Sequence, residues 1–385
     1  MKLVKSLSGL NKLKRLRVVY GIALVVILFI SASYLVRLNP YKAVSSSQFV
    51  TARVLSVTPA GAGNQVVKAK ILEGAGYGHI VSVNRGYFMT DPNSKRLPVG
   101  SETLLSVQPK NGDQYSYLDR YRLPGVLTLL AVLLVLVLVI GRWRGMTAAV
   151  GLVFSISILA VFVLPRILNG DPAFATCIEG AFMIATLSIF IAHGFNRRTT
   201  LAYVSTIVTL GLVVGIAATA VHLTGTTGDA GETINSEQEV PLLQYAPHYI
   251  DLAGLFMGGM VIASLGLLED ITTGQAAAID EIHKANPKLN SIELYKKGLS
   301  VGREHIAALI NTLAILYAGT ALPTIVVTIL YNAGNPLAVT INDETIIEAI
   351  VRTIVPSIGL LLAVPLSTGL AAYVLPRWYR HRRAI

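Results

Sequence analysis

The sequence predicts a mostly α-helical membrane protein, with eight transmembrane helices in a bundle and a small exported β domain after the first helix. Three observations support this fold class. Hydrophobic residues make up 53% of the 385-residue chain and charged residues only 14%, too few charges to cover several globular domains. The apolar residues form blocks of about 20, enough to cross a bilayer as helix. The cations gather at both chain ends and in alternate connectors, as in membrane proteins.

The net charge of +11 reflects membrane topology rather than nucleic-acid binding. Six Lys and Arg lie in residues 1–17, and four more lie in residues 377–385. Because Lys and Arg are enriched on the cytoplasmic side of membrane proteins, we expect both basic ends in the cytoplasm and no nucleic-acid partner. The single cysteine, Cys177, excludes an intrachain disulfide.

The first apolar block covers residues 18–36, directly after the basic N-terminus. Its length is that of an uncleaved signal anchor, and we assign it as the first transmembrane helix. The small residues Ser31, Ala32 and Ser33 leave a cleaved signal peptide as the alternative. The orientation of the following chain is the same in both cases.

Residues 42–122 have the composition of a small β domain. Runs rich in β-branched residues alternate there with clusters of Gly, Asn, Asp and Pro, which is typical of strands joined by turns. Strands are expected near residues 49–57, 65–72, 79–83 and 103–107. Four or five strands in about 80 residues are enough for a small barrel, for which we take the OB type as a hypothesis.

Seven further apolar blocks complete the predicted bundle within residues 125–376. They lie near residues 125–141, 146–166, 173–192, 201–222, 252–271, 305–330 and 347–375. Connectors predicted to be cytoplasmic carry Lys and Arg, whereas residues 222–250 hold four acids and no Lys or Arg. Arg166, close to Asp171, is the one cation on the wrong side. Eight crossings therefore predict a multi-pass protein of the inner or plasma membrane, with both ends inside and residues 42–122 outside.

An acid pair, Glu269 and Asp270, interrupts the otherwise uncharged stretch of residues 252–279. As a helix this stretch is about 42 Å long, against about 30 Å for the hydrocarbon core of a bilayer. The acid pair is therefore expected in or just below the inner half of the membrane.

Small residues share one helical face with Asp270, and such a face allows close helix packing. Three residues contribute to this small-residue strip: Gly259, Ala263 and Gly266. The next block carries a matching small and polar stripe that includes Asn311, so we expect the two helices to be neighbours. Possible charge partners of the acids stand just before that block: Arg303, Glu304 and His305.

An ionised carboxylate inside the bilayer is costly, about 2.5–3.5 kcal/mol for Asp at a helix centre, and such groups are usually functional. A carboxyl group sheltered from water can gain and lose a proton near neutral pH, unless a fixed cation neutralises it. The proton-coupling candidates are Asp270, Glu269 and Asn311. In the structural alternative, the two acids only end the helix at the inner interface, hydrated or paired with Arg303.

Motifs of enzymes and metal sites give no support for catalysis. The sequence holds no HExxH, no Walker-type glycine loop and no paired-cysteine cluster, so we expect no enzyme, no metal site and no cofactor. Transport, sensing and scaffolding are the remaining classes of function.

Two sequence blocks resemble the YibE/F-like family of bacterial multi-spanning membrane proteins. Residues 266–323 read GLLEDITTGQAAAIDEIHKANPKLNSIELYKKGLSVGREHIAALINTLAILYAGTALP, and residues 193–200 read HGFNRRTT. The resemblance covers the chain from about Arg142 onward, with an N-terminal anchor and β domain of the YibE type. Members of this family are integral membrane proteins regarded as permeases, and the resemblance implies the same for this chain.

The same region is more distantly similar to one half of the resistance-nodulation-division permeases and of SecD/SecF. In those proteins a small-residue helix ends in G-x-x-x-D, and here Gly266 and Asp270 occupy these two positions. The resemblance implies a role in proton coupling for Asp270. Compared with one half of those proteins, this chain has two extra spans, and it lacks the second, duplicated half. The resemblance therefore implies that a complete transport path needs a homo-oligomer or a YibF-like membrane partner.

The leading hypothesis is a proton-linked permease or export-associated transporter, with Asp270 as the titrating group, assisted by Glu269 and Asn311. The alternative is a non-transporting scaffold or sensor, whose outer β domain binds a partner or an envelope component. Both hypotheses make the lipid bilayer the first partner of the chain.

Overall fold

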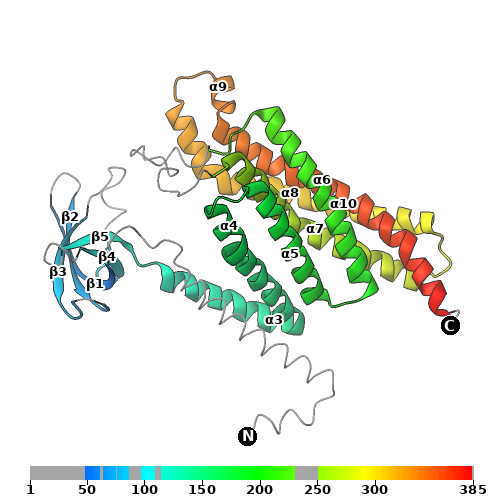
Figure 1. Cartoon of the computed structure of the whole chain (residues 1–385), viewed down its shortest axis with the longest axis horizontal. Coiled ribbons are helices and arrows are strands. Elements are labelled where there is room, and N and C mark those ends of the chain that lie inside the picture. The colour runs from blue at the N-terminus through cyan, green and yellow to red at the C-terminus, as the bar shows by residue number, and fades with distance from the viewer. Residues whose placement is uncertain are drawn as a thin grey trace, which may run out of the picture. The chain divides into compact units, whose positions relative to one another are not determined.

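The computed structural model describes residues 48–60, 64–74, 76–85, 97–108, 114–229 and 250–383. The predicted basic N-terminus and the first predicted transmembrane helix, residues 1–17 and 18–36, lie outside the described residues. The described chain falls into two compact units that divide after Gly145. One unit holds a β sheet and the start of a long helix, and the other is a helical bundle (Figure 1).

The first unit contains a five-stranded antiparallel sheet in the order β3-β2-β1-β4-β5. Its strands are β1 (Gln48–Pro59), β2 (Gln65–Ile71), β3 (Ile80–Arg85), β4 (Glu102–Gln108) and β5 (Gln114–Arg120). The four predicted strand ranges are confirmed, and β5 is the fifth strand. Alternate residues of β2 are buried, because successive side chains of a strand point to opposite faces. The buried faces form the core of this unit, in which Val54, Val67 and Leu105 are fully covered.

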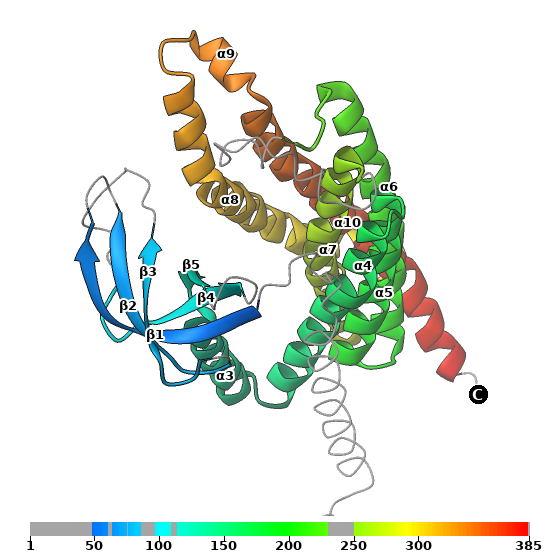
Figure 2. The same ribbon diagram turned by 60° about the vertical axis from the view of Figure 1, so that its left-hand side comes forward.

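The two edge strands, β3 and β5, approach each other because the sheet curls (Figure 2). The guanidinium of Arg85 on β3 lies 5.2 Å from the ring centroid of Tyr117 on β5. In the β2–β3 turn, Gly76 has φ +80°, and a Cβ there would come within 2.5 Å of the Tyr115 hydroxyl, so the turn requires glycine. No ladder joins β3 to β5 among the described residues. The OB-like closed barrel is therefore not confirmed.

The described residues contain seven helical segments long and apolar enough to cross a membrane. They are Leu123–Arg142, Gly145–Leu168, Ala173–His193, Arg197–Thr224, Leu252–Ala285, Ser291–Tyr331 and Glu344–Tyr379. Each corresponds to one of the seven predicted blocks from residue 125 onward, so these blocks are confirmed as helices of spanning length. The eighth predicted span is the first block, and the count of eight is not confirmed.

Eight labelled helices make up these segments and their connections (Figure 1). They are α3 (Leu123–Ile158), α4 (Leu164–Leu168), α5 (Ala173–His193), α6 (Arg197–Thr224), α7 (Leu252–Ala285), α8 (Ser291–Tyr331), α9 (Leu337–Ile341) and α10 (Glu344–Arg383). A break at Arg142, with φ 50° and ψ −129°, divides α3 between the first two spanning segments. A π-helical turn, Leu159–Val163, joins α3 to α4.

Polar side chains determine where several of these helices begin. Asn196 accepts a hydrogen bond from the backbone N–H of Thr199 at the start of α6. Asn290 and Glu293 form a capping box at the start of α8. Both arrangements satisfy backbone N–H groups that have no partner within the helix. Gly194, with φ +74°, ends α5, so the chain turns within three residues into α6.

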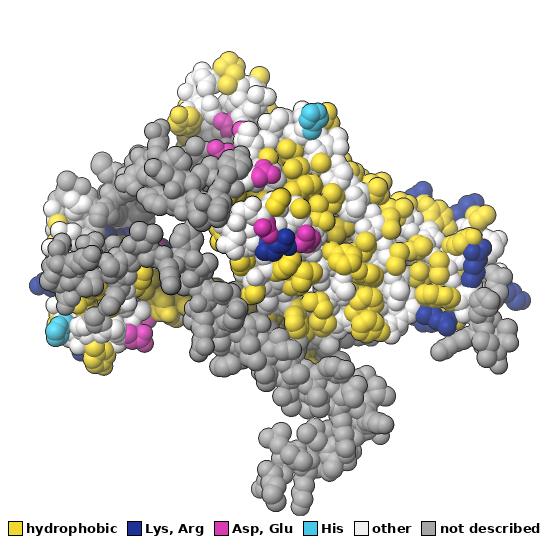
Figure 3. Space-filling view, in the orientation of Figure 1, with side chains coloured by type: hydrophobic (Ala, Val, Ile, Leu, Met, Phe, Trp, Pro, Cys, Tyr) yellow, Lys and Arg dark blue, Asp and Glu magenta, His cyan; other side chains and the backbone are white. Residues whose placement is uncertain are grey.

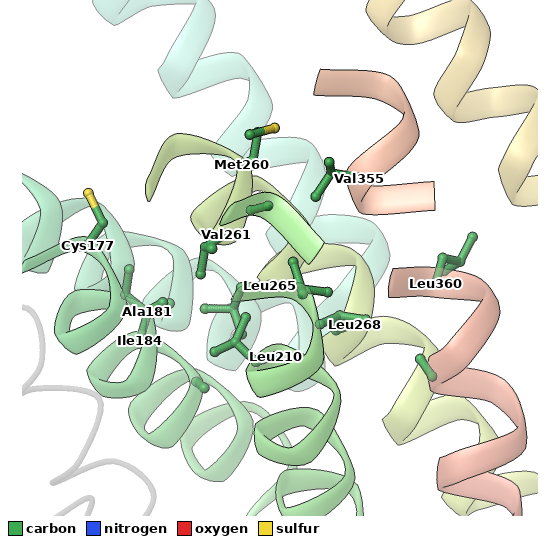
Figure 4. Packing of buried hydrophobic residues seen from close by; sticks show 14 of the residues in the cluster. Cys177, Ala181, Ile184, Leu210, Met260, Val261, Leu265, Leu268, Val355 and Leu360 are labelled. Carbon is green, nitrogen blue, oxygen red and sulfur yellow. The ribbon is translucent and has the colours of Figure 1, made fainter. Parts of the chain in front are cut away.

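Helices α6, α7 and α10 form the centre of the bundle, with α5 packed against α7 and α8 against α10. Val261, Leu265 and Leu268 of α7 lie fully inside this core, and Leu210 and Val355 approach them from α6 and α10 (Figure 4). Lipid is as apolar as these side chains, so in a membrane their packing contributes mainly dispersion contacts rather than a hydrophobic driving force.

Polar contacts hold the ends of α6, α7 and α10 together near the C-terminus. Arg197 donates a hydrogen bond to the Trp378 carbonyl at 2.9 Å and stacks on its ring at 5.4 Å. Asp280 accepts a hydrogen bond from the Tyr379 hydroxyl at 2.8 Å and pairs with Lys284 at 2.7 Å. These contacts fix the relative positions of three helix ends that are far apart in the sequence.

Charge is segregated along the bundle. In Figure 3, apolar side chains form a broad belt, Lys and Arg gather at one end of it, and Asp and Glu lie toward the other end. We refer to the end where α7 and α10 begin as the outer end, after the predicted topology, and to the opposite end as the inner end. The belt and the seven apolar helices support a multi-pass membrane protein.

Candidate functional site

The acid pair of the sequence analysis lies on α7, and its two side chains point to different surroundings. Glu269 is half-buried between α7 and α5, and its Oε1 accepts a hydrogen bond from the Ser188 hydroxyl at 2.7 Å. Gly151 of α3 lies behind Ser188, so that a Cβ there would stand 3.5 Å from the hydroxyl oxygen. The carboxylate of Glu269 therefore joins α7 to α5, and α3 lies beside the serine that donates to it.

Asp270 is exposed on the surface of the bundle. It lies 18 residues after the first residue of α7, about 27 Å along a helix at 1.5 Å per residue. His193, at the end of α5, and His305, on α8, are within electrostatic range of its carboxylate. Of the cationic side chains that the structure describes, no Lys or Arg lies within 4.0 Å of Asp270 or Glu269.

The structure brings only some of the predicted partners to the acid pair. His305 is near Asp270, whereas Arg303, Glu304 and Asn311 are exposed on α8. Within the described part of the chain, none of these three residues forms a hydrogen bond or ion pair with either acid. Ser188 was not among the predicted site residues, because it lies 81 positions before Glu269 and has no distinguishing local pattern.

The predicted small-residue strip does not pack against another helix of this chain. A Cβ added at Gly259 or Gly266 would meet nothing within 4 Å, and Ala263 is exposed. The close contacts of α7 are made by a second small face, where Gly258 lies against Cys177 of α5. The expectation that α7 and α8 are neighbours is confirmed, but Gly259 and Gly266 make no close contact between them. Both faces carry small residues at helical spacing, so the helical wheel did not distinguish them.

A buried polar layer lies beside the acid pair, toward the inner end of the bundle. Thr206 of α6 and Thr272 of α7 share a hydrogen bond at 2.6 Å between their hydroxyl oxygens. Gln275, one turn further along α7, is 2% exposed. Its Nε2 and the hydroxyl of Thr368 on α10 have no hydrogen-bond partner among the described residues. This layer was not among the predicted site residues, although polar residues at helical spacing within apolar blocks are its sequence signal.

Residues 298–302 read GLSVG, which matches the G-x-S-x-G pattern of hydrolase nucleophile elbows. That motif requires a sharp turn between a strand and a helix. Here the five residues are internal to α8. Gly298 packs against Ile279 and Thr368, and Gly302 packs against Gln275 and Val364. The two glycines therefore serve close helix packing.

A second pair of charges, which was not among the predicted site residues, lies near the outer end, in the last apolar block. Arg352 of α10 donates a hydrogen bond to Glu348 at 3.1 Å, and its guanidinium lies 4.9 Å from the ring centroid of Phe256 on α7. The Glu348 side chain is 4% exposed, whereas that of Arg352 is 51% exposed. The sequence signal is two opposite charges four residues apart inside an apolar block.

The cation that departs from the predicted topology is paired. Arg166, at the end of α4, contacts Asp171 at 2.6 Å and also forms an ion pair with Glu179. A guanidinium between two carboxylates has its charge balanced locally. Arg166 therefore does not argue against the predicted orientation of its connector.

Metal-binding geometry is not found among the described residues, where no group of three or more His, Cys, Asp and Glu side chains is placed to hold a metal ion. The expected lack of a metal or cofactor site stays a prediction.

A protein-family model described as YibE/F-like protein matches residues 129–377 of this chain. The chain belongs to the YibE/F-like family. The match extends from α3 to α10 and includes the acid pair, Ser188, the polar layer and the Arg352 pair. No curated protein and no solved structure gives a significant match, so the similarity of this YibE/F-like chain to resistance-nodulation-division permeases and SecD/SecF stays a sequence-based hypothesis.

Proposed function

We propose that this YibE/F-like protein is a proton-linked permease or export-associated transporter, in which Glu269 and Asp270 together carry the proton. The observation that supports it is the half-buried Glu269 carboxylate, held by Ser188 at 2.7 Å without a described cationic partner. A carboxylate that no fixed cation neutralises can change its charge with pH. The bilayer makes that charge costly, so its loss can drive a change in helix packing.

The two acids divide the task in this proposal. Asp270 is exposed beside two histidines, so it is the member that exchanges protons with water or with a second polypeptide. Glu269 is the sheltered member, and a proton on it removes the charge between α5 and α7. Asn311, which is exposed on α8, belongs to the proposal only if a second polypeptide brings it to the acids.

The proposal is tested by proton flux into proteoliposomes that contain a pH-sensitive dye. Glu269→Gln is expected to abolish flux, and Asp270→Asn is expected to reduce it strongly. Glu281→Gln is the matched control, because Glu281 is an exposed acid of the same helix, paired with Lys284. Wild-type flux in both acid variants would remove the acid pair from the mechanism.

We also propose the cellular context that the charge distribution favours. The chain lies in the inner or plasma membrane, with both basic ends in the cytoplasm and residues 42–122 outside. A second copy of the chain or a YibF-like protein completes the transport path, and the exposed small-residue strip with Asp270 supports such a partner. A cysteine introduced at Gly266, one turn before Asp270, is expected to cross-link two polypeptides in native membranes.

A scaffold or sensor is the second candidate function, and the β sheet supports it. Several large apolar side chains of this unit are exposed, and such residues mark protein interaction sites where they lie together. They are Phe49, Leu55, Tyr77, Ile80 and Leu118. Deletion of residues 42–122 separates the two functions. If the deletion variant no longer cross-links to envelope components but keeps its proton flux, the two roles are separable. If the full-length protein shows no proton flux at all, the scaffold is supported.

A further inference from the structure

A cavity of about 500 Å³ opens between α7, α8 and α10 toward the outer end of the bundle. Its walls include Leu255, Phe256, Gly259 and Ala263 of α7, Tyr317 of α8 and Arg352 of α10. Two of these residues, Gly259 and Ala263, belong to the small-residue strip that leads along α7 toward Asp270. The strip therefore forms part of the wall of the cavity.

Of the Glu348–Arg352 ion pair, only the positively charged member lines the cavity. Its partner Glu348 is almost completely buried, whereas the Arg352 side chain is half exposed and lines the cavity. One N–H group of the guanidinium is used by Glu348, and one of its faces lies over Phe256. A guanidinium has five N–H donors in a planar fork, so donors remain for a further anion. The Tyr317 hydroxyl, within electrostatic range of Arg352, is another donor at the same wall.

The remaining wall is apolar and has free space. Leu255 and Phe256 supply apolar side chains, and a Cβ added at Gly259 would meet no atom within 4 Å. A ligand that fills this cavity therefore needs an apolar body as well as a group that a guanidinium recognises. A polar ion alone would leave the apolar wall uncovered, and a hydrocarbon alone would leave guanidinium donors unsatisfied.

We propose that this cavity binds an amphipathic anion, with a carboxylate or phosphate head at Arg352 and an apolar chain along Gly259 and Ala263 of α7. Two acids, Asp229 and Asp251, directly follow and precede the lining residues Gly228 and Leu252. They disfavour the approach of an anion from the outer water, so the ligand enters from the bilayer. The inference goes beyond the proposed function, because it concerns equilibrium binding and holds whether or not protons are moved.

Binding is tested with the full chain in nanodiscs of phosphatidylcholine, titrated with the fluorescent fatty acid parinaric acid. Arg352→Gln is expected to weaken binding about ten-fold, or about 1.4 kcal/mol, because the variant lacks the charged hydrogen-bond donors for the head group. Arg166→Gln is the matched control, because Arg166 also lies 4.9 Å from a phenylalanine ring and is ion-paired but does not line the cavity. It is expected to bind like wild type.

A second pair of variants tests the cavity without touching a charge. Gly259→Leu fills the space beside Arg352 and is expected to abolish binding. Gly211→Leu adds the same side chain to an equally open position of α6 that does not line the cavity, and it is expected to leave binding unchanged. Helix content from circular dichroism and elution volume in size-exclusion chromatography identify any variant that fails to fold. If Arg352→Gln fails to fold, the two glycine variants still test the proposal.

The head group and the source of the ligand are tested separately. Methyl parinarate lacks the charge of parinaric acid. Wild type is expected to bind this ester about ten-fold more weakly than the acid. The Arg352→Gln variant is expected to bind the ester and the acid equally. Displacement of the acid by phosphatidylglycerol in the nanodiscs supports a lipid phosphate as the natural head, and resistance to displacement supports a free fatty acid. Equal binding of acid and ester by wild type, or wild-type binding by both Arg352→Gln and Gly259→Leu, would overturn the proposal.

Discussion

The hydroxyl of Ser188 on α5 lies 2.7 Å from Oε1 of Glu269 on α7 and donates a hydrogen bond to it. This contact joins two helices at the one acid of the pair that lies partly inside the bundle, whereas the adjacent Asp270 is exposed. Asp270, the residue to which the sequence resemblance assigns proton coupling, is therefore the more accessible member of the pair.

Ser188→Ala is expected to destabilise the bundle by about 0.6 kcal/mol, and by at most about 1.7 kcal/mol, the range for hydrogen bonds between membrane helices. Unfolding in mixed micelles with increasing dodecyl sulfate measures this change. Ser155→Ala is the matched control, because the Ser155 hydroxyl donates only to Gly151 of its own helix. Equal unfolding of the two variants would show that the contact between α5 and α7 contributes no stability.

Gly302→Ala is expected to lower the thermal unfolding midpoint, because its new methyl group would collide with Gln275 and Val364. Overpacking of this kind costs about 1–3 kcal/mol. Gly319→Ala is the control on the same helix, since a Cβ there meets nothing within 4 Å and alanine favours helix by up to about 1 kcal/mol. A Gly302→Ala protein as stable as the control would contradict the close packing of α8 on α7 and α10.

Thr206 and Thr272 are expected to be energetically coupled. Their hydroxyl oxygens are 2.6 Å apart and both residues are fully buried. Replacing each by valine, singly and together, gives a double-mutant cycle in which we expect a coupling of about 0.6 kcal/mol, and at most about 1.7 kcal/mol. A second double-mutant cycle, with Thr219 and Thr272, is the control. Thr219 is exposed and donates only to Gly215 of its own helix, so no coupling is expected.

The β unit is expected to lose a small part of its stability in acid because of Asp119. A hydrogen bond from Arg122 and one from the backbone N–H of Arg120 hold the pKa of Asp119 below its usual value of 3.8. A carboxylate with a lowered pKa in the folded state stabilises the fold above its unfolded pKa, and this contribution disappears as pH falls through the folded pKa. Both side chains of the pair are more than half exposed, so the contribution is below about 1 kcal/mol.

Asp119→Asn tests this pH dependence. Pepsin cleavage of β5 in the full chain, followed between about pH 5 and pH 2, is expected to be faster for Asp119→Asn than for wild type near pH 5. The difference is expected to vanish toward pH 2, where wild-type Asp119 is protonated. Glu73→Gln removes an exposed acid of the same unit and serves as the control. A difference between wild type and Asp119→Asn that persists at pH 2 would contradict the assignment.

Local sequence patterns predicted much of the architecture, because bilayer thickness and strand alternation act on consecutive residues. The apolar block around residues 252–271 and the run from Gln65 to Ile71 each carry their own signal, in length and in period. The acid pair was found for the same reason, since two charges inside an apolar block are visible without knowledge of their neighbours. The bounds of β2 and the first residue of α7 agree with these patterns, whereas α7 continues beyond the apolar block to Ala285.

The sequence by itself thus determined a multi-pass membrane class, seven described spanning helices, a β domain before them and an acid pair on α7. The tertiary structure decided which side of α7 packs, that Ser188 meets Glu269, and that Arg352 and Gly259 share a cavity. Helix rotation and pairing depend on steric fit between segments far apart in the chain. Because α7 has small residues on two faces, only its contacts with α5, α6 and α10 determined which face is covered.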